Sequence, residues 1–420
     1  AVVFAFSITV TAWAADAKTL DAGKWDKNTR AQLQKLIDTV GNKSKDYNAD
    51  KKPYAVFDWD QTCIFNDTEE ALFRYMIANI LFKATPKEFA KAIYNGVPKD
   101  NFGDDFKNKD GNPINIKLIG ADLEADYAFI YDNYIKEQKM SLADIQKTDQ
   151  FKDWQAKLAF LYEAIGDKFS ADISYPWVLY LFVGMTVDEV KAVSEQSDDF
   201  NLKEKIGTYV LESPASLPGK AGVVSYKYKS GLRIQPEMVN LMAVLRANGI
   251  DVYVCSASLD NVVRVFAGTK YGYNVPEENV IGMKIKLDKK GKYLPEYDYS
   301  NKYPQTQRAG KVTAINQVLV KKYGYGPVFV AGDSSGDFNM ISEFPDTKLG
   351  LIINRLYDNS FGKLGLIAWE DLQKKNPTPR YVLQGRDENA GAFRPSISTI
   401  KMGQTKEAAF KATIDPTIKK

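Results

Sequence analysis

The most informative part of this sequence is Tyr54-Ala55-Val56-Phe57-Asp58-Trp59-Asp60-Gln61-Thr62, an apolar run that stops abruptly at two carboxylates. A short apolar run of this kind is typical of a buried strand in a parallel sheet. In open α/β sheets the chemistry collects at the carboxyl ends of such strands, and here Asp58, Asp60 and the Thr62 hydroxyl lie at that end. A single Asp after a strand is more simply explained as a helix N-cap. The interpretation therefore depends on partners further along the chain.

An alternating pattern of helices and strands supplies the context for this stretch. The predicted elements are a helix over 27–40, a strand over 54–58, a helix over 236–248, a strand over 250–255, a helix over 310–323 and strands over 327–331 and 348–353. Such alternation predicts an α/β fold with a doubly wound parallel sheet and helices on both faces. Between the first strand and Gly231 the pattern is mainly helical, which indicates an inserted helical domain.

The predicted organisation has five parts. They are a signal peptide remnant at 1–14, an N-terminal helical segment at 15–50, a core at 51–70 and 231–358, a helical insert at 71–230 and a C-terminal extension at 359–420. The arginines of the extension, Arg380, Arg386 and Arg394, are candidates either to brace the core or to reach the insert.

Length and composition fit an ordinary globular protein. The chain has 420 residues, of which 45% are hydrophobic and 26% charged, and its net charge is +3. This length favours two or three domains, and the nearly balanced charge gives no reason to expect nucleic acid or an anionic membrane as a partner. The mean hydropathy of -0.34 and the lack of an apolar run of about 18 residues predict no membrane span. No feature of the sequence indicates a protein partner.

The segment 1–14 carries no charge and consists mostly of apolar or small residues. Ala12-Trp13-Ala14 has the small-x-small form that signal peptidase recognises, and polar sequence begins at Asp16. We expect a secretory signal sequence here, with the mature chain starting at Ala15, and hence a periplasmic or secreted protein. The alternative is an N-terminal strand or core segment.

The cysteine and histidine contents narrow the possible chemistry. The two cysteines, Cys63 and Cys255, each adjoin a predicted strand end, so we expect free buried thiols rather than a disulfide. Histidine is absent, which excludes Ser-His-Asp and Cys-His catalysis and His-ligated zinc. Hydrolysis by this chain must use carboxylates, lysine or a metal with oxygen ligands.

Three further signals lie at or near predicted strand ends. Ser256, followed by Ala257, ends the strand 250–255; Lys311 starts a helix; and Gly332-Asp333-Ser334-Ser335-Gly336-Asp337 follows the strand 327–331. Each has a simple explanation alone, as a helix cap, a solvated lysine or a turn. Their order behind D-x-D-x-T in an α/β pattern points instead to one shared site.

The residue types at this site suit phosphoryl transfer. Several carboxylates near one point repel one another, so a cation must offset them, and oxygen-only ligands favour Mg²⁺. The metal, Lys311 and the Ser256 hydroxyl can together hold the charge of a phosphate. One carboxylate can act as a nucleophile that forms an aspartyl phosphate. A second carboxylate, two residues on, can protonate the leaving group and later activate water.

These motifs resemble those of haloacid dehalogenase (HAD) superfamily phosphatases with a C1-type helical cap. The resemblance implies Asp58 as nucleophile and Asp60 as general acid and base. It also implies a phosphate-binding role for a set of residues that comprises Thr62, Ser256, Ala257 and Lys311. The implied Mg²⁺ ligands are Asp58, the Asp60 backbone carbonyl, Asp333 and Asp337.

A narrower resemblance connects the chain to bacterial phosphorylcholine phosphatases and to phosphoserine phosphatase-like hydrolases. It rests on Tyr175-Pro176-Trp177 and on the segment 380–387. A box of aromatic side chains suits a quaternary ammonium group, and nearby acidic residues can add electrostatic attraction for this group. The aromatic candidates for substrate binding are Trp59, Tyr175, Trp177 and Tyr180, and the acidic ones are Asp67, Glu69 and Glu70. The alternative is that these aromatics form the core of the insert and the acids a helix N-terminus.

The sequence thus predicts an exported Mg²⁺-dependent phosphomonoesterase for small phosphorylated metabolites, with phosphorylcholine or phosphoethanolamine as candidate substrates. The alternatives are a phosphoserine-type or broad-specificity acid phosphatase, and a non-catalytic phosphate- or solute-binding protein on the same fold. A further alternative is a 2-haloacid dehalogenase, which uses an Asp nucleophile without a metal and does not require Asp60.

Overall fold

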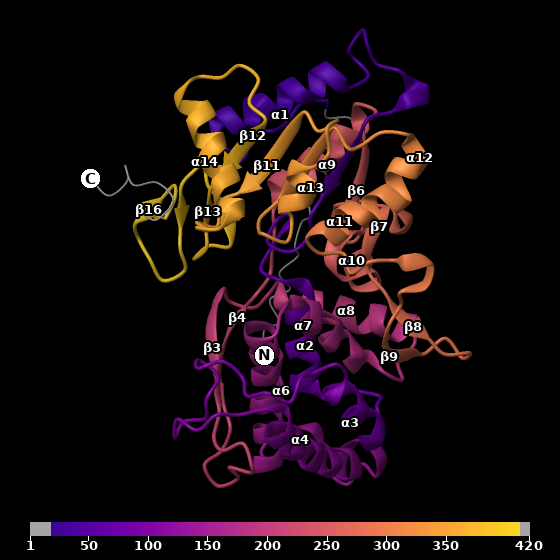
Figure 1. Ribbon diagram of the computed structural model, residues 1–420, viewed down its shortest axis with the longest axis vertical. Helices are drawn as coiled ribbons and strands as arrows, with labels where there is room; N and C mark the ends of the chain where they lie inside the picture. Colours follow the sequence, from indigo (N-terminus) through magenta and orange to yellow (C-terminus); the bar gives the residue numbers. More distant parts are fainter. Residues whose placement is uncertain (1–17, 412–420) are drawn as a thin grey trace, which may run out of the picture.

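The computed structural model describes residues 18–411. Its centre is a six-stranded sheet with the strand order β12-β11-β10-β1-β6-β7, in which all neighbouring strands are parallel. The strands are β1 (Tyr54–Phe57), β6 (Asp251–Leu259), β7 (Val280–Met283), β10 (Phe329–Gly332), β11 (Leu349–Ile353) and β12 (Tyr381–Gln384). The predicted α/β fold is confirmed, and the sheet occupies the upper half of the molecule in Figure 1.

Helices cover both faces of this sheet. The first face carries α1 (Lys27–Val40), α9 (Pro236–Ala247) and α10 (Asp260–Ala267). The second face carries α11 (Ala309–Ile315), η6 (Asn316–Val320), α12 (Lys321–Tyr323), α13 (Phe338–Ser342) and α14 (Ser360–Gln373). Successive side chains of a strand point to opposite faces, so Ala55 and Phe57 belong to the first core and Tyr54 and Val56 to the second. Because both faces are buried, the whole of β1 is apolar or aromatic.

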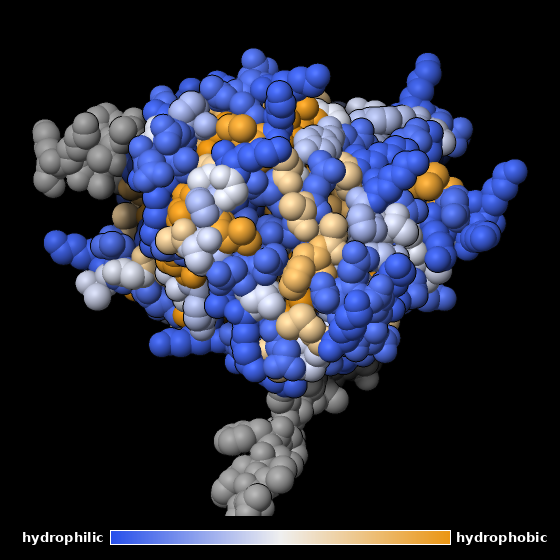
Figure 2. Space-filling model, turned by 90° about the horizontal axis from the view of Figure 1, so that it is seen from below, coloured by the Kyte–Doolittle hydropathy of each residue, from blue (hydrophilic) through white to orange (hydrophobic). Residues whose placement is uncertain are grey.

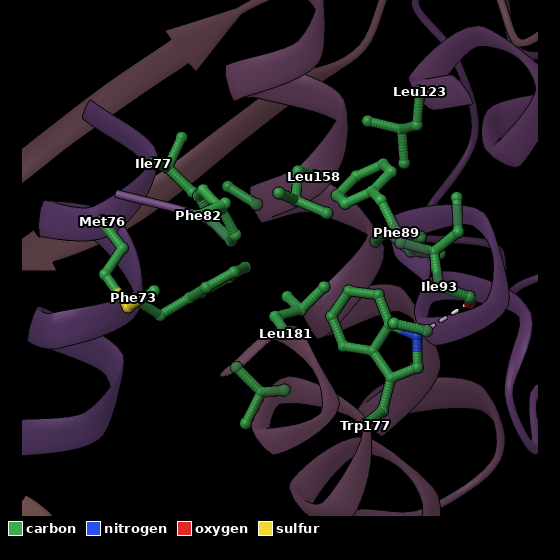
Figure 3. Packing of buried hydrophobic residues seen from close by; sticks show 14 of the residues in the cluster. Phe73, Met76, Ile77, Phe82, Phe89, Ile93, Leu123, Leu158, Trp177 and Leu181 are labelled. Carbon is green, nitrogen blue, oxygen red and sulfur yellow. Dashed lines mark hydrogen bonds between the residues drawn. The ribbon is translucent and has the colours of Figure 1, made fainter. Parts of the chain in front are cut away.

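Between β2 (Ile64–Phe65) and β5 (Arg233–Ile234) the chain leaves the sheet and forms a mainly helical part, which we call the cap (Figure 1). Its helices are α2 (Thr68–Asn79), α3 (Pro86–Tyr94), α4 (Ile116–Ile130), η2 (Tyr131–Lys136), α5 (Leu142–Ile145), α6 (Asp149–Lys168), α7 (Ala171–Leu179), η3 (Tyr180–Phe182) and α8 (Val187–Asn201). β2 and β5 pair antiparallel, so the outgoing and returning segments lie side by side. The cap packs around a hydrophobic cluster that extends to residues of β6, α10, β7, β8 (Ile285–Leu287) and β9 (Tyr293–Tyr297), and part of this cluster is seen in Figure 3.

The cap is mainly helical, as the sequence pattern indicates, but it also contains a hairpin that the sequence reasoning did not identify. Its last part is an antiparallel hairpin of β3 (Gly207–Glu212) and β4 (Ser225–Ser230). In β4, tyrosine and lysine alternate, so the pattern has the period of a strand with one polar side. The hairpin carries Tyr226, Tyr228 and Lys229 to the wall of the cavity described below.

The sheet also continues beyond the predicted core, which ended at 358. Helix α14 and the edge strand β12 both lie in the predicted C-terminal extension. The strands that follow form a separate four-stranded sheet, in the order β14-β13-β15-β16. They are β13 (Arg386–Asp387), β14 (Ala392–Phe393), β15 (Thr399–Ile400) and β16 (Glu407–Ala408). A small hairpin of β8 and β9 contacts the cap, where the Tyr293 amide donates to the Met185 carbonyl at 2.8 Å. The short turns η1 (Ala49–Lys51), η4 (Glu277–Asn279) and η5 (Ser300–Lys302) complete the described fold.

Cys63 and Cys255 are both buried free thiols, as expected. Among residues 18–411, no helix combines the length and the apolar character needed to cross a bilayer. The surface of the cap end, seen from below in Figure 2, is mostly hydrophilic and is crossed by a band of hydrophobic residues. The predicted signal sequence at 1–14 lies outside the described residues.

Candidate active site

The carboxyl ends of the central strands open into a cavity of about 720 Å³ that is bounded on its other side by the cap. Asp58 follows β1, Asp333 follows β10, and Lys311 projects from α11. The predicted site residues that line this cavity are Asp58, Asp60, Ser256, Ala257, Lys311, Asp333, Asp337 and Tyr175. The sequence motifs, far apart in the chain, are thus assembled at one edge of the sheet.

Asp58 lies between a cation and a hydroxyl donor. The Lys311 ammonium is 2.6 Å from Asp58 Oδ1, and the Thr62 hydroxyl donates to Asp58 Oδ2 at 2.7 Å. Thr62 is completely buried, and its hydroxyl is also 3.2 Å from Asp333 Oδ1. Both contacts leave the Asp58 carboxylate fixed in orientation at the base of the cavity.

A tight turn after β1 creates this arrangement. Gln61 adopts the left-handed conformation, with φ of 64°, and the Cys63 amide donates to the Trp59 carbonyl at 2.8 Å. The chain therefore reverses immediately after Asp60. This reversal brings Thr62 back against the carboxylate that ended the strand.

Asp60 is held by donors from two other elements. The Thr68 amide at the start of α2 donates to Asp60 Oδ1 at 2.7 Å, and the Ser258 hydroxyl donates to Oδ2 at 2.7 Å. The predicted partner Ser256 lies 3.5 Å from the same oxygen. Burial raises the pKa of the Asp60 carboxyl, and this favours the protonated form that a general acid needs.

The second carboxylate pair depends on a glycine. A side chain at Gly332 would place its Cβ only 2.6 Å from the Asp337 Cβ, so only glycine lets Asp337 fold back against the strand end. Asp337 Oδ2 then accepts from the Asp333 amide at 3.0 Å. Its other oxygen lies 2.7 Å from the Lys311 ammonium.

Three buried carboxylates consequently converge on one point. Ligand oxygens of Asp58, Asp333 and Asp337 lie within 4.8 Å of one another. Burial raises the pKa of Asp58 well above its usual value, and the charge of Asp337 adds to this rise. Burial opposes the charge on Lys311, but the two carboxylates outweigh it and raise the pKa of the ammonium. Lys311, together with Arg355 paired to Asp333, offsets only part of the negative charge of these three carboxylates. The all-oxygen donor set fits a hard divalent cation.

Two of the predicted aromatic residues do not reach the cavity. Trp59 is completely buried; its indole packs against Tyr273, with ring centroids 4.8 Å apart, and donates to the Thr68 hydroxyl at 3.1 Å. Trp177 is completely buried in the cap core, where it donates to the Ile93 carbonyl at 2.8 Å (Figure 3). The expectation that these indoles contact substrate is therefore corrected. Tyr180 also lies away from the residues that line the cavity.

The cap side of the cavity is acidic and aromatic. It contains the predicted residues Asp67, Glu69, Glu70 and Tyr175, together with Glu163, Tyr162, Tyr226 and Tyr228. Burial raises the pKa of Glu163, and the nearby Glu70 charge raises it further. Within the described chain, the cation paired to these acids is Arg74, 3.4 Å from Glu70, and Lys227 and Lys229 of β4 also line the cavity. Among the described residues, this wall therefore carries more acids than bases.

Sequence reasoning missed two polar residues of the site, Ser258 and Arg355, and named a third, Arg386, without its contact. Ser258 binds Asp60 and lies in the strand already identified by Ser256. Arg355 pairs with Asp333 and follows β11 at the same sheet edge. Its position just after the predicted strand 348–353 could have identified it as a site residue. Arg386 donates to the Gln61 side chain at 2.8 Å. That contact joins residues 325 positions apart, and no local pattern could have revealed it.

Comparisons with known proteins agree with this geometry. A family model described as haloacid dehalogenase-like hydrolase matches residues 222–342. The solved structure of a conserved functionally unknown protein from Anaerococcus prevotii is 35% identical in sequence, with a TM-score of 0.85. The match covers 91% of this chain and 98% of that one. The chain belongs to the haloacid dehalogenase-like hydrolases. The predicted family and enzyme class, a phosphoric monoester hydrolase, are confirmed.

Two curated proteins are also similar to the chain. A phosphorylcholine phosphatase of Pseudomonas aeruginosa is 24% identical over 381 residues, which span 83% of this chain and 86% of that protein. A chloroplastic phosphoserine phosphatase of Arabidopsis thaliana is 26% identical over 120 residues, which span 29% of this chain and 38% of that protein.

Proposed function

We propose that this hydrolase cleaves small phosphate monoesters whose leaving group carries an ammonium charge, such as phosphorylcholine or phosphoethanolamine. The observation that carries the proposal is the distribution of charged groups in the cavity. The phosphoryl-binding end holds Lys311 and Asp58 in contact at 2.6 Å, and the cap wall holds Glu70 and Glu163 beside tyrosines. The name of the Pseudomonas relative, phosphorylcholine phosphatase, supports the same substrate class.

The chemistry begins with Asp58. Its carboxylate attacks phosphorus, and the bond between phosphorus and the ester oxygen breaks as Asp60 gives its proton to the leaving oxygen. Water then attacks the aspartyl phosphate, and Asp60 takes a proton from that water. Inorganic phosphate leaves and the Asp58 carboxylate is restored. Lys311 and the hydroxyl of Ser256 stabilise the charge on the phosphoryl oxygens throughout.

We further propose that Mg²⁺ is the cofactor. The buried carboxylates of Asp58, Asp333 and Asp337 fit it by donor type and by their mutual approach within 4.8 Å. When bound, the ion supplies positive charge that offsets these carboxylates and polarises the phosphoryl group. Export to the periplasm or outside the cell also stays a proposal, which rests on the sequence of 1–14.

The acids of the cap wall have a direct role in choosing the leaving group. A trimethylammonium or primary ammonium group placed against Tyr162 and Tyr226 gains cation–π contacts, each about 0.5–2 kcal/mol. Glu70 and Glu163 add coulombic attraction in a partly desolvated site. A neutral alcohol such as glycerol would bury these acids without compensation.

A second candidate is a phosphoserine-type enzyme, because Arg74 lies in the cavity and the Arabidopsis relative is named for phosphoserine. A serine leaving group has both an ammonium and a carboxylate, and Arg74 is the cap cation that would bind the carboxylate. In the structure Arg74 is already engaged, with Glu70 at 3.4 Å and with the Tyr228 ring at 5.1 Å. We therefore rank the simple ammonium ester first.

The test compares kcat/KM for phosphorylcholine, phosphoethanolamine, phosphoserine, glycerol phosphate and p-nitrophenyl phosphate, with Mg²⁺ and after EDTA. We expect the amine esters to be preferred and EDTA to remove all turnover reversibly. Preference for phosphoserine would favour the second candidate, and preference for glycerol phosphate would reject an ammonium site. Metal-independent turnover would indicate dehalogenase-like chemistry, and no turnover at all would indicate a binding protein.

The nucleophile is tested by Asp58→Asn. An amide keeps the shape of the side chain but cannot attack phosphorus, so we expect kcat to fall by about 10³-fold or more. The melting temperature should be unchanged or higher, because one of three mutually repelling carboxylates has been removed. Activity within tenfold of the parent enzyme would contradict the aspartyl-phosphate mechanism.

A further inference from the structure

The site contains a second cation that the known motifs do not explain. Arg355 lies just past the end of β11, next to β10 in the sheet. Its Nη1 atom is paired with Asp333 Oδ2, and its guanidinium is 5.0 Å from the Tyr357 ring. The side chain is only 16% exposed, yet Arg355 and Tyr357 both line the catalytic cavity. Arg355 is therefore fixed beside the catalytic carboxylates and still faces the substrate space.

The hydrogen-bonding capacity of Arg355 is largely unused. Apart from the Nη1 contact with Asp333, its guanidinium makes no hydrogen bond with any residue that the structure describes. Nε is buried and lacks a partner within the described chain. A guanidinium has five N–H donors and is suited to planar recognition of phosphate oxygens. Donors left over at a cavity wall are available to a ligand.

The charge balance of the site calls for an additional cation. If Arg355 is set aside, the three carboxylates of Asp58, Asp333 and Asp337 have Lys311 as their one cationic contact within the described chain. A divalent ion would bring this group to neutrality, and a phosphate dianion would then arrive without further compensation. Arg355 supplies that compensation at fixed charge, because a guanidinium does not lose its proton in proteins.

A neighbouring lysine makes this wall more positive. Lys229 of β4 also lines the cavity and forms no ion pair with the described residues. Burial lowers its pKa, and the charge of Arg355 lowers it further, so the two cations lie close enough to repel each other. Asp333 faces Arg355 and the charge of Glu388 acts on Lys229, but neither carboxylate forms an ion pair with Lys229 in the described chain, so its ammonium adds positive charge that an anion in the cavity would complement.

We propose that Arg355 is a phosphate-binding residue, which with Lys311 clamps the oxygens of the transferred phosphoryl group and of the phosphate product. The inference rests on the proposed phosphatase function. It differs from a purely structural role, in which Arg355 would only orient Asp333 toward a metal. Loss of a phosphate-binding residue should weaken phosphate binding and leave metal binding intact. Loss of a residue that only orients Asp333 should weaken metal binding instead.

The experiment measures two affinities in the full-length chain. Isothermal titration gives the Kd of inorganic phosphate at saturating Mg²⁺, and electron paramagnetic resonance gives the Kd of Mn²⁺ without phosphate. For Arg355→Gln we expect phosphate to bind about 10- to 100-fold more weakly, the equivalent of losing charged hydrogen bonds. Mn²⁺ should bind as well or more tightly, because a cation that competes for Asp333 is gone. Arg355→Lys keeps the charge and should recover part of the phosphate affinity, and it serves as the test if the Gln variant does not fold.

The matched control is Arg308→Gln. Arg308 lines the same cavity, but its side chain is 52% exposed and forms an ion pair with Asp172, at 3.7 Å. Loss of this exposed charge should weaken phosphate binding by less than about fivefold.

The proposal is overturned if phosphate affinity is unchanged in both Arg355 variants, or if Arg308→Gln weakens it equally. It is also overturned if Mn²⁺ binding weakens and saturating Mg²⁺ restores normal phosphate binding, since Arg355 would then only orient Asp333. A parent enzyme that neither binds phosphate nor hydrolyses esters would instead reject the proposed function itself.

Discussion

At the scale of single residues, the cavity separates two kinds of charge. Lys311 and Arg355 pair with the catalytic carboxylates, whereas Glu70 and Glu163 line the cap side of the cavity. A substrate with a negative phosphoryl end and a positive leaving end matches this separation. The separation also lets affinity for the two ends be altered independently, because different side chains provide it.

The leaving-group end is tested by Glu163→Gln. The carboxyl of Glu163 accepts a hydrogen bond from the Tyr226 hydroxyl at 3.1 Å, and glutamine preserves an acceptor there while removing the charge. We expect KM for phosphorylcholine to rise about 3- to 10-fold, in line with about 1 kcal/mol of lost attraction. KM for p-nitrophenyl phosphate should change less than twofold.

The control for Glu163 is Asp105→Asn, which removes an exposed acid from the mouth of the same cavity. It should leave both KM values nearly unchanged because surface charge is screened by salt. An equal rise of KM for both substrates in Glu163→Gln would argue against an ammonium subsite.

The corrected role of Trp59 gives a further prediction at the residue scale. Its indole fills the core against Tyr273 and donates to Thr68, so Trp59→Phe should reduce the free energy of unfolding by about 1–3 kcal/mol. The ratio of kcat/KM for phosphorylcholine to that for p-nitrophenyl phosphate should stay constant. Denaturant unfolding and the two kinetic assays check both parts, and a change in the ratio would restore the original substrate-contact hypothesis.

At the scale of elements, the packing of α4 against α6 depends on a buried charge cluster in the cap. The Lys157 ammonium lies 2.8 Å from both Asp122 and Asp153, and all three are nearly inaccessible to solvent. Asp126 Oδ2 and Asp153 Oδ1 have no donor within the described residues. A proton held by Asp126 supplies that donor, which agrees with the rise in its pKa to about 9, caused by burial and by the hydrogen bond with Asp153.

This proton makes the stability of the cap depend on pH. The ordinary pKa of Asp126 is 3.8 and the folded value is about 9, so between these values the folded chain binds a proton that the unfolded chain releases. Stability from this group is therefore lost as pH rises through that window. Asp126→Asn provides a permanent donor, and its melting temperature should exceed that of the parent protein increasingly from pH 5 to pH 8.5.

For the matched variant in the same cluster we expect the opposite change in melting temperature. Asp122 accepts from Lys157 and from the amides of Lys220 and Ala221, so Asp122→Asn should lower the melting temperature across the whole range. If the difference in melting temperature between Asp126→Asn and the parent protein does not change with pH, Asp126 is ionised in the folded state.

Particular elements explain what sequence reasoning could and could not reach. Strand β1 and its two carboxylates were predictable because burial on both faces and the D-x-D-x-T spacing are local patterns. The burial of Trp59 in the core could have been predicted from strand periodicity. Ala55, Phe57 and Trp59 alternate along the chain and all belong to the same core cluster, on the side away from Asp58. The hairpin β3–β4 was missed inside a mainly helical region. Arg386 was a candidate to brace the core, but its contact with Gln61 could not be predicted because it depends on tertiary folding.

At the scale of the whole molecule, the N-terminal helix α1 contacts the edge strand β12 of the C-terminal extension. The Thr29 hydroxyl of α1 donates to the Leu383 carbonyl at 2.8 Å, and the Asp26 amide donates to the Gln384 side chain at 2.8 Å. From there the small C-terminal sheet extends beside the core (Figure 1). The extension is thereby an integral part of the fold, and it places Arg386 against the catalytic turn.

Arg386 links the extension to catalysis through a buried network. It is almost inaccessible and donates to Glu388 at 2.7 Å and to Gln61 at 2.8 Å. Its guanidinium also lies 5.0 Å from the Phe65 ring. Burial alone would raise the pKa of Glu388, but Arg386 and Lys401 hold it at about 2. The network therefore stays charged at neutral pH and fixes the turn that carries Asp58 and Asp60.

Arg386→Gln should consequently impair stability and catalysis by separable routes. The buried Glu388 would retain only Lys401 as a cation, which should cost about 3–5 kcal/mol of unfolding free energy. The Gln61 turn would lose its anchor, and a displacement of about 1 Å there can reduce kcat by about 10²-fold. In the double variant Arg386→Gln/Glu388→Gln, the unpaired charge is gone, so stability should largely recover while kcat stays low. Recovery of kcat together with stability would mean that Arg386 supports the fold alone and has no part in positioning the catalytic turn.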